Sequence, residues 1–304
     1  MTGPTGAGRA EGLSFSPDDS VSTALSKMSR ALVDAGIEDA ASAQRDARFL
    51  LQGVLGVDGA SLLTAPERPL GGKASALVDA AHRRLRHEPI SRILGSREFY
   101  GREFVVTPDV LDPRPDTEAV VDLAMAFCAE AGFIERPVRI ADIGTGSGIL
   151  IGTLLAELPL ATGIATDVSA PALAVAERNA ERLGVSDRCT FVLTSGLDGR
   201  DETFDLIVSN PPYIPSGDIA TLGAEVRDFD PVVALDGGRD GLNIYREFAR
   251  GLVPRLRQGC LIVEFGSGQD ADIERIFSEC GWRVKTWKRD LGGHIRAVAL
   301  EIHP

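Results

Sequence analysis

From about residue 138 to the end of the chain, short apolar runs rich in β-branched residues alternate with segments of helical periodicity. Repeated strand–helix alternation is typical of an α/β domain with a parallel, doubly wound sheet. The last two runs have a short connection, so we expect one of these two strands to run antiparallel. The expected strands are 138–143, 163–168, 190–193, 204–209, 260–265, 283–287 and 295–302, and the expected helices are 148–157, 170–183, 241–256 and 270–280.

A glycine-rich turn, Gly144-Thr145-Gly146-Ser147-Gly148, follows the first strand and opens the first helix. Glycines permit a tight turn and close approach of a ligand, and a helix N-terminus offers free N–H groups. The spacing matches neither the dinucleotide pattern G-x-G-x-x-G nor a P-loop. Asp167 ends the next strand, where a carboxylate can accept from both hydroxyls of a ribose; its alternative role is the N-cap of the helix from Ala170. The glycine-rich turn and Asp167 together predict an adenosine-type cofactor.

The segment 204–215, FDLIVSNPPYIP, begins as a buried strand and leaves the sheet at two consecutive prolines, which cannot donate to a ladder. The residue before a proline is pushed toward extended geometry, which holds Asn210 at the carboxyl end of the strand. The Asn210 amide oxygen and the Pro211 carbonyl are two acceptors that can hold both protons of one NH2 group. Tyr213 supplies a flat face for stacking on that planar group.

This NPPY tetrapeptide suits a reaction at nitrogen, and its alternative interpretation is a plain strand-ending turn. Together with the glycine-rich turn and Asp167, it selects S-adenosyl-L-methionine over NAD as the predicted cofactor.

The N-terminal part of the chain shows helical spacing without strand alternation. We expect helices from a Ser20 cap to Gly36, from about 41 to Gly56, and from 74 to about 87. The basic run HRRLRH at 82–87 is interpreted as the solvated end of the third helix, with a docking patch for an acidic partner as the alternative. Glycines and aromatic residues in 89–115 predict a hairpin or extended linker, followed by an apolar helix that Asp116 or Thr117 could cap.

Composition is that of an ordinary globular protein, with 44% hydrophobic and 25% charged residues among 304. Residues 1–16 are small and polar without an apolar core, so we expect a disordered tail and no signal peptide. No apolar run reaches the roughly 18 residues of a membrane span. The four cysteines and four histidines show no zinc spacing, so we expect reduced thiols, no metal site and a cytoplasmic location.

The net charge of −12 is carried almost wholly by the second part of the chain. Residues 1–90 hold 11 acidic and 10 basic side chains, whereas the remainder holds 33 and 22. A surface of that sign repels phosphate backbones. This balance argues against DNA or RNA as the direct substrate.

The chain resembles the glutamine methyltransferases that modify peptide chain release factors. The resemblance runs from about residue 20 to the end, and its most specific parts are the linker and IVSNPPYIP at 207–215. Further matching stretches are DARFLLQGVLG at 46–56, HEPISRILGSREFYGREFVVTPDVLDPRPDTE at 87–118, DIGTGSG at 142–148, DVSAPALAVAERNA at 167–180, DFDPVVALDGGRDGLNIY at 228–245, VEFGSGQ at 263–269 and DLGGHIR at 290–296.

After the expected disordered tail (1–16), the resemblance implies a helical substrate-recognition domain (17–90), a hairpin linker (91–115) and a Rossmann-like class I methyltransferase domain (116–304). Residues Gly144 to Gly148 would line the methionine part of S-adenosyl-L-methionine, and Asp167 would bind its ribose. Asn210 would lie between cofactor and substrate. Asn210, Pro211, Pro212 and Tyr213 would hold the glutamine side chain of the Gly-Gly-Gln loop of a release factor, with the enzyme as a monomer.

One departure from the family pattern lies after the third strand. Many members carry an acid followed by a bulky residue near the adenine, whereas this chain has Thr194-Ser195-Gly196-Leu197. Three other functions stay open at this point. They are glutamine methylation of a ribosomal or other protein, amino-methylation of adenine or cytosine in nucleic acid, and cofactor binding without catalysis.

Overall fold

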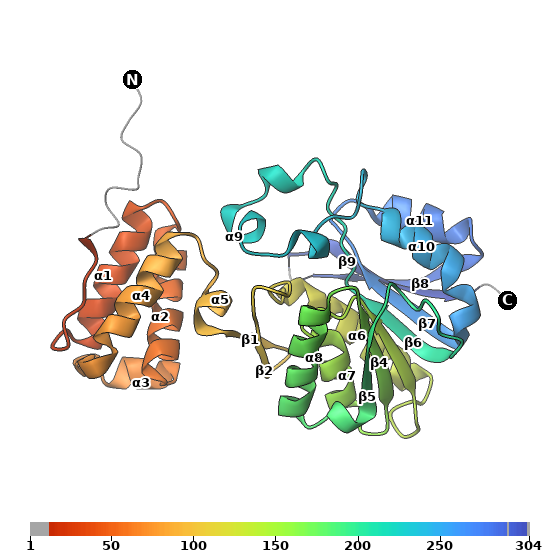
Figure 1. Cartoon of the computed structure of the whole chain (residues 1–304), viewed down its shortest axis with the longest axis horizontal. Helices are drawn as coiled ribbons and strands as arrows, with labels where there is room; N and C mark the ends of the chain where they lie inside the picture. The colour runs from red at the N-terminus through yellow and green to blue at the C-terminus, as the bar shows by residue number, and fades with distance from the viewer. Residues whose placement is uncertain (1–11, 291, 303–304) are drawn as a thin grey trace. The chain divides into compact units, whose positions relative to one another are not determined.

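The computed structural model describes residues 12–290 and 292–302, and the chain divides into two compact units, 1–95 and 96–304 (Figure 1). The first unit is helical, as predicted. Its cap at Ser20 accepts from the Thr23 N–H at 3.2 Å, and Gly56 ends the second helix in the left-handed conformation. The helices are α1 (Val21–Asp34), α2 (Ala40–Leu55), α3 (Gly59–Thr64), α4 (Ala74–Leu85) and α5 (Ile90–Leu94). The short helices α3 and α5 were not predicted.

The core of the first unit begins before the first helix. Phe15 is buried against the apolar faces of the helices, together with Met28, Leu50 and Leu77. The expectation of a disordered tail over 1–16 is therefore wrong at its end, because Phe15 contributes apolar area to the core. Residues 1–11 of that expected tail lie outside the described residues.

Arg84 corrects the interpretation of the basic run at 82–87. Its side chain is 2% exposed and pairs with Asp46 at 2.8 Å and with Glu38 at 2.6 Å. A buried guanidinium is retained only when carboxylates and hydrogen bonds compensate its lost hydration. Arg84 thus joins parts of the helical unit through buried ion pairs, whereas Arg86 in the same run is exposed.

The second unit opens with a β-hairpin. Strands β1 (Ser96–Phe99) and β2 (Arg102–Val105) pair antiparallel, joined by Tyr100 and Gly101 with positive φ angles of 51° and 71°. A two-residue turn with both φ angles positive matches the twist of a hairpin. Within the predicted hairpin linker a hairpin is present at Ser96–Val105, inside the second unit, and it is held to helix α8 (Ala170–Leu183) because the Val105 N–H donates to Asn179 Oδ1 at 2.7 Å.

A seven-stranded sheet in the order β5-β4-β3-β6-β7-β9-β8 organises the second unit. Neighbours from β5 to β7 are parallel, and β9 is antiparallel to both β7 and β8. The predicted doubly wound sheet with one antiparallel strand is confirmed. The strands are β3 (Arg139–Ile143), β4 (Thr162–Asp167), β5 (Cys189–Leu193), β6 (Phe204–Ser209), β7 (Leu256–Glu264), β8 (Trp282–Arg289) and β9 (Ile295–Ile302).

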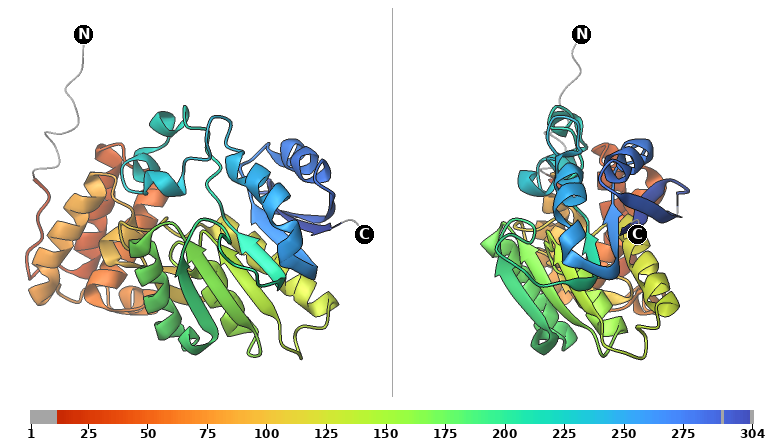
Figure 2. Two further views of the ribbon diagram at one scale, coloured as in Figure 1. Left: turned by 45° about the vertical axis from the view of Figure 1, so that its right-hand side comes forward. Right: turned by 90° about the vertical axis from the view of Figure 1, so that its right-hand side faces the viewer.

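Helices cover both faces of this sheet (Figures 1 and 2). One core joins α6, α7 and α8 to alternate strand residues such as Ile140 and Leu206. The other joins α10 and α11 to the intervening residues such as Ala141 and Ile207. This division follows from the two-residue period of a strand. The helices are α6 (Glu118–Glu130), α7 (Ile149–Glu157), α8 (Ala170–Leu183), α9 (Ala224–Arg227), α10 (Asn243–Gly251) and α11 (Asp270–Ser278).

Helix α10 is shorter than the expected 241–256. It ends at Gly251, and Val253–Arg255 forms a separate 3-10 turn. Pro254 explains the break, because proline lacks the N–H that the next helical turn requires.

The described residues contain no helix that is both long and apolar enough to span a bilayer. Cys128, Cys189, Cys260 and Cys280 are free thiols.

Candidate functional site

A cavity of about 490 Å³ lies where the carboxyl ends of β3, β4, β5 and β6 meet. The chain leaves β3 toward β4 on one side, whereas β6 lies on its other side. This reversal of strand order opens a crevice at the sheet edge, which is where α/β proteins bind ligands. The cavity wall therefore combines loops that are far apart in the sequence.

The glycine-rich turn forms one wall. Gly144 and Thr145 both donate their N–H groups to the Thr166 carbonyl, at 2.8 and 2.9 Å, which ties the turn to β4. Residues Gly144 to Ser147 line the cavity, but Gly148 is not among the lining residues. Gly148 adopts φ 78° at the start of α7, and a Cβ there would lie 3.1 Å from the Ala176 Cβ. Gly148 thus serves the close approach of α7 and α8.

Asp142 holds this turn from behind. Its Oδ2 accepts from the Thr145 hydroxyl at 2.7 Å and from the Ile151 N–H at 3.2 Å. Burial raises the pKa of Asp142 to about 7, against the lowering effect of these hydrogen bonds. Thr145, one of the predicted cofactor residues, lines the cavity, and its hydroxyl donates to Asp142.

Asp167 lines the cavity at the end of β4. Its Oδ2 accepts from the Gly146 N–H and its Oδ1 from the Ser169 N–H, each at 2.9 Å. The N-cap of α8 is Ser169, whose hydroxyl accepts from the Ala172 N–H, so the alternative role of Asp167 as that cap is wrong. Each carboxylate oxygen retains a further lone pair that a sugar hydroxyl can use.

The Thr194-Ser195-Gly196-Leu197 segment, the departure from the family pattern, also lines the cavity. The Thr194 N–H donates to the Asp167 carbonyl at 3.0 Å, and Leu197 is buried in the core on the α10 face. Asp198, which the sequence analysis did not select, lies in the same wall. The only sequence signal for it is an acid close behind the end of a predicted strand.

Strand β6 brings the NPPY segment to the opposite wall. The Ser209 hydroxyl donates to the Ile143 carbonyl at 2.6 Å, which joins the ends of β6 and β3. Asn210, Pro211 and Pro212 line the cavity. Asn210 donates from Nδ2 to the Thr117 hydroxyl at 3.1 Å. Among the described residues, neither Asn210 Oδ1 nor the Pro211 carbonyl accepts a hydrogen bond, so both acceptors remain available.

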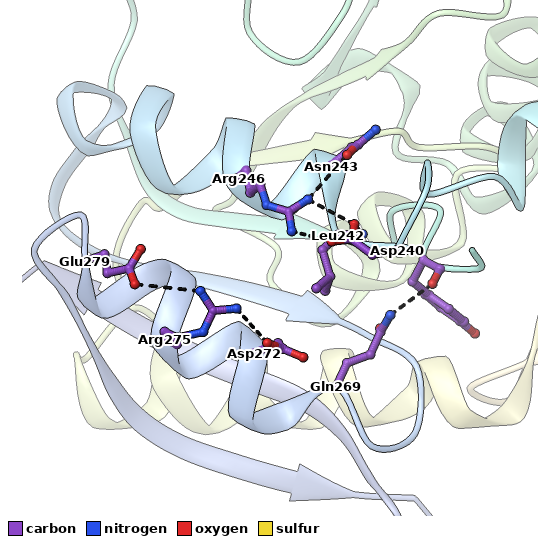
Figure 3. A network of polar contacts seen from close by, with 9 residues as sticks. Asp240, Leu242, Asn243, Arg246, Gln269, Asp272, Arg275 and Glu279 are labelled. Carbon is purple, nitrogen blue, oxygen red and sulfur yellow. Dashed lines mark hydrogen bonds and ion pairs between the residues drawn. The ribbon is translucent and has the colours of Figure 1, made fainter. Parts of the chain in front are cut away.

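Tyr213 does not line this cavity. Its hydroxyl donates to Glu264 Oε1 at 3.4 Å, and its carbonyl accepts from Gln269 Nε2 at 3.1 Å. Burial raises the pKa of the Tyr213 hydroxyl, so it stays protonated at neutral pH. Figure 3 shows Gln269 just before α11. It also shows the ion pair between Asp240 and Arg246, which lies at the start of α10.

Two glycines pack closely against the backbone of the NPPY segment. A Cβ on Gly237 would lie 2.7 Å from the Pro212 carbonyl oxygen, and one on Gly241 would collide with the Tyr213 carbonyl oxygen. Gly241 also has φ 76°, which favours glycine. The sequence analysis gave these glycines only as part of a matching stretch, and contacts between segments so far apart carry no local signal.

Thr117 and Glu264 are buried polar residues beside the NPPY segment that the sequence analysis did not assign to the site. Thr117, one of the two expected caps, stands at the N-cap position of α6, but its side chain makes no capping hydrogen bond. The Thr117 hydroxyl is buried and accepts from Asn210 Nδ2 at 3.1 Å, while Glu264 Oε1 accepts from the Tyr213 hydroxyl at 3.4 Å. Burial raises the pKa of Glu264 to about 7. A polar residue ending an apolar strand was the available signal.

Asp230 anchors the loop that precedes the cavity wall at Pro231. Its buried carboxylate accepts from the Asp112 N–H at 3.1 Å and from Arg114 Nη2 at 2.5 Å. Charge-assisted hydrogen bonds of this kind hold two segments in one geometry. The loop is thereby tied to the segment that follows the hairpin. Within the described residues, no group of three or more metal-ligating side chains is placed to hold a metal ion.

Comparisons with known proteins agree with this geometry. Residues 23–95 match the PrmC N-terminal domain, and residues 118–224 match the methyltransferase small domain. A release factor glutamine methyltransferase of Bradyrhizobium diazoefficiens is 44% identical over 94% of this chain and 96% of its own length. The Cereibacter sphaeroides protein of the same name is 41% identical over 89% and 94%.

Among solved structures, the hMettl16 catalytic domain in complex with a MAT2A 3′UTR hairpin has a TM-score of 0.54, with 18% identity over 76% of this chain and 82% of that chain. That likeness concerns the fold alone and confirms the class I methyltransferase sheet. The identities to the curated relatives extend over nearly the whole length of both chains. This chain therefore belongs to the release factor glutamine methyltransferase family.

Proposed function

We propose that this chain carries out the reaction for which its family is named. It transfers a methyl group from S-adenosyl-L-methionine to the side-chain amide nitrogen of the glutamine in the Gly-Gly-Gln motif of peptide chain release factors. The observation that carries the assignment of the site is the placement of two available acceptors, Asn210 Oδ1 and the Pro211 carbonyl, in one cavity with the glycine-rich turn.

The residues of the cavity fit this cofactor. Backbone groups of Gly144 to Ser147 surround the methionine part, Asp167 accepts from the ribose hydroxyls, and Leu197 offers an apolar surface to the adenine. A cavity of about 490 Å³ has the size of a typical cofactor site. When bound, S-adenosyl-L-methionine supplies a methyl group activated by its positively charged sulfur.

The protein must make a poor nucleophile react. A carboxamide nitrogen has its lone pair delocalised into the carbonyl group. Asn210 Oδ1 and the Pro211 carbonyl accept hydrogen bonds from the two N–H groups of the glutamine amide. These bonds orient the nitrogen toward the methyl group. The same two dipoles stabilise the positive charge that develops on nitrogen during transfer. Pro212 fixes the backbone, and Tyr213, which lies outside the cavity lining, holds the segment through its bonds to Glu264 and Gln269 in place of the predicted stacking on the amide plane.

The transfer is direct, without a covalent enzyme intermediate and without a metal: the glutamine nitrogen gains the methyl group and releases one of its two protons to solvent. The enzyme acts as a monomer in the cytoplasm, where release factors work, and does not bind nucleic acid directly. Support for the last point comes from the net charge of −12, which repels phosphate backbones.

The test is mass spectrometry of a purified release factor after incubation with the enzyme and cofactor. The expected result is a gain of one methyl group on the glutamine of the Gly-Gly-Gln loop, absent when that glutamine is replaced. Parallel incubations contain ribosomal proteins and adenine- or cytosine-bearing oligonucleotides. Methylation of one of these, with an unmodified release factor, would overturn the proposed substrate. Cofactor binding without any transfer would overturn the enzymatic assignment.

A further inference from the structure

The stretch VEFGSGQ at 263–269 begins in β7 and contacts Tyr213 at two points. The Tyr213 hydroxyl donates to Glu264 Oε1 at 3.4 Å, and Gln269 Nε2 donates to the Tyr213 carbonyl at 3.1 Å. A Cβ on Gly266 would lie 3.3 Å from Tyr213 Cδ2, so the absence of a side chain there lets the tyrosine ring come close. None of the residues 263–269, all of which the structure describes, belongs to the cavity wall. The stretch therefore contacts the NPPY segment from outside the cavity.

Hydrogen bonds fix the orientation of the Gln269 side-chain amide. The Gly266 N–H donates to Gln269 Oε1 at 2.8 Å. The main chain closes the same turn, because the Gln269 N–H donates to the Gly266 carbonyl at 3.2 Å and Gly268 adopts a φ of 84°. A main-chain N–H can only donate, so Oε1 must face Gly266. The NH2 end of the amide is thereby directed to the Tyr213 carbonyl.

The main chain of the NPPY segment depends on this bond because its own residues make few others. Pro211 and Pro212 have no N–H. Across the described part of the chain, the bond from Gln269 is the single hydrogen bond to a main-chain atom of residues 211–213. The proline rings fix the φ angles at 211 and 212, but the ψ angles can rotate unless the chain is held beyond them. The bond to the Tyr213 carbonyl holds the chain at that point.

We propose that Gln269 is a positioning residue for methyl transfer. Its bond to the Tyr213 carbonyl holds the NPPY backbone so that the Pro211 carbonyl stays in place to accept from the substrate glutamine. The inference rests on the role proposed above for the Pro211 carbonyl. Because neither Gln269 nor Tyr213 lines the cavity, the effect acts through the backbone and not through contact with substrate or cofactor.

The loop before α10 leaves the space in which this bond forms. A Cβ on Gly241 would lie 2.8 Å from Gln269 Nε2 and would also collide with the Tyr213 carbonyl oxygen. The loop is held at the start of α10, because Asp240 pairs with Arg246 at 2.5 Å (Figure 3). The glycine is thus kept beside the bond, where a side chain would displace one of its two partners.

The experiment measures kcat for a release factor and the Kd of the cofactor in full-length wild type, Gln269→Glu and Gln269→Met. The glutamate variant can still accept from the Gly266 N–H, but it presents a second acceptor to the Tyr213 carbonyl. We expect its kcat at pH 8 to fall about tenfold, with a change of less than about threefold in the Kd of the cofactor. Gln269→Met loses both bonds, and we expect at least the same loss of kcat. Ser267→Glu, at an exposed position of the same turn, is the control for added charge and is expected to keep the wild-type kcat.

The pH dependence separates positioning from a general loss of structure. A protonated carboxyl group can again donate to the Tyr213 carbonyl. We therefore expect the kcat of Gln269→Glu, divided by that of the wild type, to rise as the pH falls from about 8 to about 5, toward the usual pKa of glutamate. In Gln269→Met the same ratio should stay constant. This variant keeps the neighbouring acids Glu264, Asp240 and Asp270 but cannot titrate at position 269.

Three results would overturn the inference. They are wild-type kcat in both Gln269 variants, a loss in Gln269→Glu that lower pH does not relieve, and a loss of cofactor affinity as large as the loss of kcat. Circular dichroism verifies that each variant is folded.

Failure of the proposed function gives a different result. A wild type that transfers no methyl group to a release factor refutes that function, whatever the variants do. Hydrogen–deuterium exchange at Ile214 then tests the positioning role by itself, because the Ile214 N–H follows Tyr213 and donates to the Leu235 carbonyl at 3.0 Å. We expect faster exchange in Gln269→Glu than in the wild type and in Ser267→Glu. Equal exchange in the three proteins would show that Gln269 does not hold the segment.

Discussion

Asn210 illustrates how neighbouring groups prepare one side chain for its task. The prolines that follow it hold its backbone at the end of β6, and Thr117 takes up the donor end of its amide. The Oδ1 end and the adjacent Pro211 carbonyl remain for a ligand. The motif itself was recognisable in the sequence, but its partner Thr117 lies 93 positions away.

We expect Asn210→Ala to lower kcat at least about 100-fold while the Kd of the cofactor changes less than about threefold. The reason is that the proposed role of Asn210 concerns the charge that develops on the glutamine nitrogen, whereas cofactor binding is assigned to the glycine-rich turn and Asp167. Steady-state kinetics and calorimetric titration provide the two measurements. An equal loss of turnover and cofactor affinity would contradict this division of roles.

The raised pKa of Glu264 predicts how the stability of the fold depends on pH. Its pKa rises from 4.5 to about 7 on folding because burial disfavours the charged form. The folded state therefore binds this proton more tightly than the unfolded state. Its stabilising contribution is complete below about pH 4.5 and is lost as the pH rises through about 7.

We therefore expect the free energy of unfolding of Glu264→Gln to increase relative to that of the wild type as the pH rises from 5 to 8. The expected change in this difference is up to about 3 kcal/mol. Denaturant unfolding of both proteins at the two pH values measures the difference. Asp142 titrates in both proteins and cancels in the comparison. A difference between the two proteins that does not depend on pH would show that Glu264 is not the titrating group.

At the scale of elements, the loop at 237–241 packs its backbone against the NPPY segment. The close approach requires the absence of a side chain at Gly237 and Gly241. This contact, together with the Gln269 bond to the Tyr213 carbonyl, keeps the segment after β6 in one conformation. The loop thus contributes to the site without lining it at these glycines.

Gly241→Ala is expected to destabilise the protein by about 1–3 kcal/mol and to lower kcat, because the new Cβ would displace Tyr213 and strain a positive φ. The matched control is Gly217→Ala, since Gly217 lies in the same connection, has open space around it and no positive φ. Thermal unfolding and initial rates of both variants test the effect. Equal behaviour of the two variants would refute the packing argument.

At the scale of the molecule, the reversal of strand order between β3 and β6 creates the crevice and brings the two halves of the site together. The residues proposed to bind the cofactor follow β3, β4 and β5, and those proposed to hold the substrate follow β6. Their separation along the chain is large, but parallel neighbouring strands end at the same edge. A ligand bound there contacts residues at the ends of four strands. It should therefore stabilise the sheet as a whole.

We expect saturating S-adenosyl-L-methionine, at about 100 times its Kd, to stabilise the protein by about 2.7 kcal/mol and to raise its Tm by several degrees. Asp167→Ala should lose most of this rise, because its carboxylate is assigned to the ribose. Asp187→Ala, an exposed acid outside the cavity, serves as the control. A full rise in Asp167→Ala would remove Asp167 from the cofactor site.

Local patterns in the sequence were enough for the doubly wound sheet, the caps at Ser20 and Gly56, the hairpin, the glycine-rich turn and the NPPY segment. Periodicity, glycine and proline act on the nearest residues, so a single stretch records them. Only the tertiary structure decided that Thr117 bonds to Asn210, that Gly241 lies against Tyr213 and that Arg84 is buried. Those properties depend on which distant segments the sheet places side by side, and burial turns an ordinary polar residue into one whose partners and pKa matter.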